Sequence, residues 1–269
     1  MKNRVVVSGS ARLAVSELGR GSAVLLIHAG VADRRSWYSV MNSLADRWRV
    51  VAYDQRGFGD TAYEAETYSS VDDLVAVLDA LEVERAVIVG CSRGGQVAFD
   101  AAFRAAPRVA GLVLIGSAPE GAPPSPLPSA TEALFDEVDR AEEEGDIVCL
   151  NTLEAHLWLD GPESADGRVS GPARDLFLDM NGRALAALPT GEHEAPTADW
   201  RNLSEVRVPT VVIAGRLDLA PIQARAREMS ETIPGAHLVM LDESAHLPML
   251  DCPEVLVSVL SRFLETVVS

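Results

Sequence analysis

The chain has 269 residues, 48% of them hydrophobic, which is enough to bury the core of one α/β domain with insertions. Its formal net charge of -17 argues against partners such as nucleic acid or anionic membrane surfaces, because both require basic patches. The 3 cysteines have no paired spacing, so neither a disulfide framework nor a zinc site is indicated. No segment resembles a signal peptide or a membrane span. We therefore predict a globular, cytoplasmic protein.

Strand-like and helical segments alternate along the first part of the chain. Two short strand-like runs separated by Ser8-Gly9-Ser10 predict an antiparallel hairpin at the edge of a sheet. Four continuous apolar runs then have the character of strands buried on both faces, at 23–27, 49–53, 86–89 and 109–115. Helical patterns occur between them at 36–47 and 69–82. The alternation predicts βαβ units and a mostly parallel, twisted sheet.

This alternation stops between Gly116 and about Trp200. A proline-rich stretch at 118–128 is typical of a linker, and three helical patterns follow at 130–144, 147–159 and 173–188. A helical insertion of this size is most simply a lid over the functional site. We assign 1–118 and 201–269 to an α/β core and 119–200 to a helical lid inserted after the sixth strand.

The lid segment also carries most of the net charge. Residues 120–199 hold 18 Asp and Glu against 4 Arg, whereas the rest of the chain is nearly balanced. If these acids face the site, their field favours neutral or cationic substrates over anionic ones. If they face outward they serve only solubility, which is the usual role of charged helix faces.

After the insertion the alternation resumes. The remaining patterns predict strands at 209–214 and 236–241, each followed by a helix, at 221–232 and 253–266. They complete an α/β chain without internal repeats.

The stretch Gly90-Cys91-Ser92-Arg93-Gly94 is a G-x-S-x-G sequence between a buried strand and a helix. The glycines permit a sharp turn that exposes the serine hydroxyl above the sheet. The N-terminus of the following helix directs N–H groups at the same point, where they would stabilise an oxyanion. Ser92 is therefore the candidate nucleophile. Taken alone, the motif is also compatible with a glycine-rich turn in which the serine has no catalytic role.

A serine nucleophile needs a base, and the base needs a third group to orient it. Among the 5 histidines, His246 follows the last strand and is expected at the carboxyl edge of the sheet, where the turn around Ser92 also opens. Asp218 follows another strand at that edge, and Glu120 is the alternative acid. The chain order Ser92, Asp218, His246 is the order of nucleophile, acid and histidine in proteins with this turn.

Together these motifs make the chain resemble the α/β-hydrolase fold, and within it the lidded serine esterases, lactonases and cofactor-free haloperoxidases. The resemblance covers nearly the whole length. Besides the G-x-S-x-G turn, it rests on His28-Ala29-Gly30, Asp54-Gln55-Arg56-Gly57-Phe58-Gly59, Gly215-x-x-Asp218 and Ala245-His246-x-Pro248. Two departures are Ala29, where glycine is usual, and Arg93, where methionine, leucine or glutamine often follows the serine.

The resemblance implies a serine hydrolase that cleaves a small carboxylic ester or lactone through an acyl-enzyme on Ser92. It implies a small-molecule substrate, no cofactor and no metal. The oxyanion would be held by the backbone N–H groups of Gly30 and Arg93. We interpret His28, Asp54 and Arg56 as loop-fixing and Trp37 as a core residue.

Other functions on this scaffold stay open. A carbon–carbon bond hydrolase, or an acyltransferase or perhydrolase, would use the same three catalytic residues. A non-catalytic small-molecule receptor is the alternative outside the enzymes.

Overall fold

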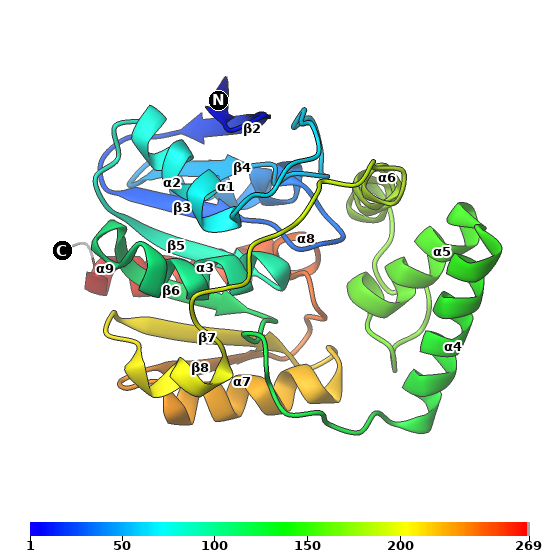
Figure 1. Ribbon diagram of the computed structural model, residues 1–269. Coiled ribbons are helices and arrows are strands. Elements are labelled where there is room, and N and C mark those ends of the chain that lie inside the picture. Colours follow the sequence, from blue (N-terminus) through cyan, green and yellow to red (C-terminus); the bar gives the residue numbers. More distant parts are fainter. Residues whose placement is uncertain (268–269) are drawn as a thin grey trace.

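The computed structural model describes residues 1–267, whose strands form a single sheet with helices on both faces (Figure 1). The strands are β1 (Lys2–Ser8), β2 (Ala11–Leu18), β3 (Ala23–Ile27), β4 (Arg49–Tyr53), β5 (Ala86–Cys91), β6 (Val109–Ile115), β7 (Thr210–Gly215) and β8 (His237–Leu241). Their order in the sheet is β1-β2-β4-β3-β5-β6-β7-β8. The strands from β3 to β8 run parallel, while β2 pairs antiparallel with β1 and β4. The predicted hairpin and mostly parallel sheet are confirmed.

The central strands are apolar throughout because helices cover the sheet on both faces. In β3, Leu25 and Ile27 face α2 (Ser70–Ala80), α3 (Arg93–Arg104) and α7 (Ala220–Thr232). Val24 and Leu26 point the other way, toward α1 (Tyr38–Leu44) and α9 (Pro253–Val267). Trp37, in the short 3-10 helix Arg34–Trp37 before α1, is fully buried in this second layer, as expected of a core residue.

The insertion between β6 and β7 stands beside the sheet rather than on either face (Figure 1). It contains α4 (Ser129–Glu144), α5 (Ile147–Glu154), a π-helix (Ala155–Asp160) and α6 (Pro172–Leu185). The single helix expected at 147–159 is therefore divided. The carbonyl of Trp158 accepts a hydrogen bond from the backbone N–H of His246 (3.2 Å), so the last turn is tied to a distant loop.

Three further short elements complete the described chain: the 3-10 helices Ala106–Arg108 and Trp200–Glu205 and the helix α8 (Pro248–Asp251). No helix within residues 1–267 combines the length and apolar character needed to cross a membrane. The cytoplasmic location stays a prediction.

Candidate active site

The turn between β5 and α3 holds Ser92 in a conformation that few residues other than glycine adopt, with φ +52° and ψ -118°. The backbone N–H of Ser92 donates to Ile115 (2.8 Å), and its carbonyl accepts from the hydroxyl of Ser117 (2.7 Å). A Cβ at Gly90 or Gly94 would overlap backbone atoms of neighbouring segments. These hydrogen bonds and the close packing hold Ser92 in its strained backbone conformation, as is common at functional sites.

Asp218 and His246 come together at the carboxyl edge of the sheet. The Oδ2 atom of Asp218 lies 2.8 Å from Nδ1 of His246, and both side chains are buried. The other carboxylate oxygen accepts the backbone N–H of Leu219 (2.7 Å), which fixes its orientation. Because a carboxylate only accepts, Nδ1 of the neutral ring carries the proton and Nε2 keeps its lone pair.

The loop of His246 touches the turn that carries Ser92. The thiol of Cys91 donates to the carbonyl oxygen of His246 (3.4 Å). A Cβ at Gly116 would lie 3.0 Å from Nδ1 of His246 and 3.3 Å from Oδ2 of Asp218, so this glycine leaves room for the pair. Within residues 1–267, no hydrogen bond joins the side chains of Ser92 and His246.

The two predicted oxyanion donors lie next to each other. A Cβ at Gly30 would be 3.9 Å from Cβ and Cδ of Arg93. Ala29, the departure from the usual glycine, is buried in the core layer beneath this loop. Its methyl group therefore packs inward and leaves the site open.

His28 holds the same loop from below. Its Nε2 accepts the backbone N–H of Gln55 (3.0 Å), and its Nδ1 donates to the carbonyl of Ala29 (2.8 Å). Burial lowers the pKa of His28 to about 4, so the ring is neutral near pH 7. These contacts match the loop-fixing role expected from the sequence.

Asp54 and Arg56 brace the neighbouring loop. The Asp54 carboxylate accepts the backbone N–H groups of Arg34 (2.8 Å) and Asp60 (2.7 Å) and is paired with the Arg34 guanidinium. Burial raises the pKa of Asp54 to about 6. Arg56 donates to both carboxylate oxygens of Asp73, at 2.9 and 3.0 Å. Both contacts agree with the loop-fixing interpretation.

Residues of the insertion also hold the loop of His246, and no local pattern in the sequence indicates them. The rings of Trp158 and His246 lie 4.7 Å apart between centroids. Arg168 donates to the carbonyls of Leu159 (2.7 Å) and Glu243 (3.0 Å) and pairs with Asp251 (2.8 Å). Asp251 in turn accepts the N–H of Ala245 at 2.7 Å and the hydroxyl of Ser244 at 2.8 Å. Arg168 therefore clamps the residues just before His246.

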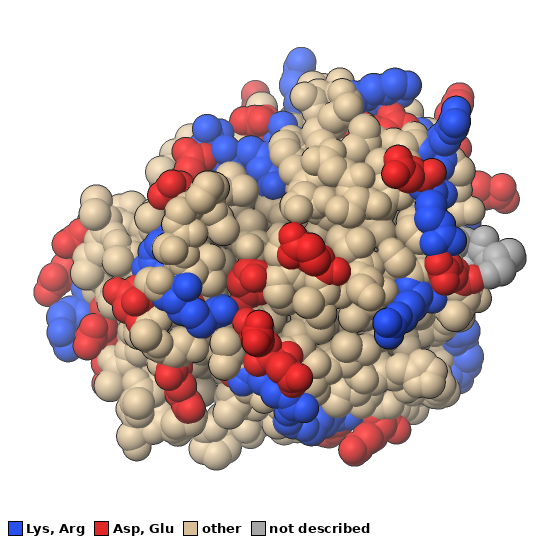
Figure 2. Space-filling view, turned by 180° about the vertical axis from the view of Figure 1, so that it is seen from behind, with Lys and Arg blue, Asp and Glu red and all other residues tan. Residues whose placement is uncertain are grey.

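The acidic residues of the insertion face outward. Of the 18 Asp and Glu at 120–199, 15 are exposed. Figure 2 shows acidic side chains scattered over the outer surface of the lobe at the left, which is the insertion seen from behind. Glu120, the alternative acid, is exposed and lines a cavity beside α3, separate from the Asp218–His246 pair. This placement favours the solubility interpretation of the acidic charge.

Comparison with known proteins identifies the family, since residues 24–259 match the model of the alpha/beta hydrolase family. The chain belongs to this family. It is 30% identical over 254 residues to pimeloyl-[acyl-carrier protein] methyl ester esterase of Nitrosomonas europaea, covering 92% of this chain and 98% of that protein. A shorter match, 40% identical over 124 residues and 43% of each chain, is to 2-hydroxymuconate semialdehyde hydrolase of Pseudomonas sp. strain CF600.

Among solved structures, the hydrolase is similar to Est816, described as an N-acyl homoserine lactone degrading enzyme. The TM-score is 0.72 at 26% identity, over 96% of this chain and 99% of that one. The predicted fold and the prediction of an α/β-fold ester hydrolase are confirmed by these likenesses.

Proposed function

We propose that this hydrolase cleaves a small carboxylic ester or lactone through an acyl-enzyme on Ser92. The observation that carries the proposal is the buried 2.8 Å hydrogen bond between Asp218 and His246, at the same edge of the sheet as the strained Ser92. A carboxylate in this position orients the imidazole and stabilises its protonated form. The esterase and the lactone-degrading enzyme named above act on bonds of the same class.

In the proposed reaction each of these groups has one role. Nε2 of His246 takes the proton of the Ser92 hydroxyl as Oγ attacks the carbonyl carbon. The backbone N–H groups of Gly30 and Arg93 stabilise the negative oxygen that develops. His246 returns the proton to the leaving alkoxide, the alcohol departs, and the acyl-enzyme remains. A water molecule, deprotonated by His246, releases the acid and restores Ser92.

Residues 119–200 act as the lid in this proposal, and 1–118 with 201–269 form the catalytic core. The ring of Trp158, packed against His246, and the clamp made by Arg168 support this role. The lid would cover the site and also hold the base in place.

Carbon–carbon bond hydrolysis is the second candidate. It is favoured by the 40% identity to 2-hydroxymuconate semialdehyde hydrolase over part of the chain. The same three residues would serve, so a panel of acyl esters, lactones and vinylogous diketones separates the two reactions by which substrate class is turned over fastest.

Replacement of the nucleophile tests the proposal. We expect Ser92→Ala to lower kcat for p-nitrophenyl acetate by about 10⁴ to 10⁶, because removal of one member disables the catalytic unit. Labelling of the wild type, but not the variant, by a fluorophosphonate is the control for a working nucleophile, and circular dichroism is the control for folding. Retention of more than a tenth of the activity would exclude Ser92, and stoichiometric binding of esters without turnover would indicate a receptor.

A further inference from the structure

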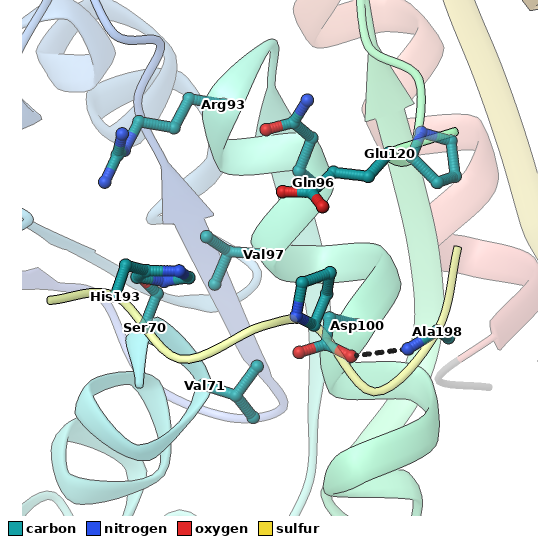
Figure 3. A pocket seen from close by; sticks show the side chains of 11 residues that line it. Ser70, Val71, Arg93, Gln96, Val97, Asp100, Glu120, His193 and Ala198 are labelled. Carbon is teal, nitrogen blue, oxygen red and sulfur yellow. Dashed lines mark hydrogen bonds between the residues drawn. The ribbon is translucent and has the colours of Figure 1, made fainter. Parts of the chain in front are cut away.

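A cavity of about 190 Å³ runs along α3, and its lining includes Arg93 but not Ser92, Asp218 or His246 (Figure 3). One face of α3 forms its wall, with Arg93, Gln96, Val97 and Asp100 at the spacing of successive helical turns. The segment 192–198, which returns from the insertion, lies across it. Arg93 directly follows Ser92 in the chain, so its side chain connects the turn that carries Ser92 with this cavity.

The guanidinium of Arg93 has no partner of opposite charge. Its Nε atom is buried without a hydrogen-bond partner, and within residues 1–267 no carboxylate lies within 4.0 Å of the group. Its carbon lies 5.8 Å from the centre of the Phe58 ring. Arg34 and Arg168, by contrast, are each paired with a carboxylate. A guanidinium that lines a cavity without a carboxylate partner is suited to bind an anion there.

The other polar side chains that line the cavity do not neutralise the Arg93 guanidinium. Burial and the charge of Arg93 lower the pKa of His193, whose Nε2 is hydrogen-bonded to the hydroxyl of Ser70 (2.8 Å). The Asp100 carboxylate accepts the N–H groups of Thr197 (2.7 Å) and Ala198 (3.1 Å). Figure 3 shows Glu120 on the opposite side of the cavity from the Arg93 guanidinium.

We propose that Arg93 binds a free carboxylate at the far end of the acyl chain, so that the preferred substrates are monoesters of dicarboxylic acids. This rests on the proposed function of Ser92. A guanidinium presents two parallel N–H donors that match the two oxygens of a carboxylate. Val71 and Val97 give part of the same cavity an apolar lining. Arg93 thus favours anionic substrates. Acidic residues of the insertion facing the site would instead have favoured neutral or cationic ones.

A matched pair of substrates tests the inference. Mono-p-nitrophenyl glutarate carries the carboxylate, and p-nitrophenyl 5-methylhexanoate replaces it by an isopropyl group of similar shape. We expect Arg93→Met to lower the ratio of their kcat/KM values by about tenfold or more, because charge-assisted hydrogen bonds are lost. Arg225→Met is the matched control, since Arg225 also has a buried, unpartnered Nε but does not line the cavity. An unchanged ratio in Arg93→Met overturns the inference.

Binding without turnover separates this inference from the proposed mechanism. We expect monomethyl glutarate to bind Ser92→Ala in calorimetry, and to bind Ser92→Ala/Arg93→Met about tenfold or more weakly. If the wild type hydrolyses neutral esters while the two variants bind monomethyl glutarate equally, the carboxylate site is refuted and the mechanism stands. If binding depends on Arg93 but Ser92→Ala retains hydrolysis, the carboxylate site stands and the mechanism fails.

Discussion

The carboxyl edge of the sheet and the helical insertion hold their side chains by different means. At the sheet edge, backbone hydrogen bonds and close packing around glycine set the position of Ser92. Ion pairs hold the insertion, within itself between Arg174 and Asp160 (2.6 Å), and against the core between Arg168 and Asp251 (2.8 Å) and between Asp179 and Arg35 (2.7 Å). Substitutions at the carboxyl edge of the sheet should therefore abolish ester hydrolysis, whereas substitutions in the insertion should only reduce its rate.

The largest difference in kcat is expected between substitutions of two carboxylates, one at the sheet edge and one in the insertion. We expect Asp218→Asn to lower kcat by about 10⁴, because the amide cannot stabilise the imidazolium or hold the same tautomer. Glu120→Gln, at the base of the insertion, should change kcat by less than about tenfold, since Glu120 lies beside α3. Steady-state kinetics with one neutral ester decide the matter. A larger loss in Glu120→Gln than in Asp218→Asn would reverse the assignment of the acid.

The sheet edge should also respond to pH through His28. Burial lowers its pKa from 6.5 to about 4, so unfolding takes up a proton between these pH values. Neutral His28 therefore makes its full contribution to the free energy of unfolding above about pH 6.5. This contribution decreases as the pH falls toward 4. We expect the stability advantage of the wild type over His28→Gln to shrink by about 3 kcal/mol across this range.

Urea denaturation at several pH values measures this difference. Asp54 has its pKa raised to about 6 and acts in the opposite direction, but it is present in both proteins and cancels in the comparison. A stability difference that stays constant between pH 7 and 4 would show that His28 does not remain neutral in the folded protein.

Arg168 tests whether the insertion positions the base. We expect Arg168→Gln to lower kcat about 10- to 100-fold with little change in KM, because the loop before His246 loses its clamp while the binding surface remains. Arg140→Gln, on the exposed side of α4, is the matched control. Partial recovery in Arg168→Lys, which restores the charge but not the full set of donors, would support positioning. A rise in KM alone would instead place Arg168 in substrate binding.

The smallest effect is expected at an exposed ion pair between the two regions. Arg183 of α6 and Asp60 of the core lie 3.3 Å apart, and each is about half exposed (48% and 54%). Such pairs contribute about 1 kcal/mol or less, and salt weakens them. We expect Arg183→Gln to change the free energy of unfolding within that limit, with the difference vanishing in high salt. A loss well above it would mean that the insertion depends on this contact to stay docked.

Much of the core was predictable because its signals are local. A continuous apolar run predicts a strand covered on both faces, as in Ala23–Ile27, and the glycines around Ser92 predict the sharp turn. Even the contact between Asp218 and His246 followed from placing each residue after a parallel strand, since such strand ends meet at one edge.

The insertion was predictable only as a set of helices. The π-helix Ala155–Asp160, the packing of Trp158 on His246 and the clamp made by Arg168 all depend on partners far away in the chain. Likewise, the sequence determined that Arg93 follows Ser92, but only the tertiary structure left its guanidinium unpaired in a cavity. Local patterns encode backbone conformation and burial, whereas the partner of a charged side chain is decided by which distant segments pack together.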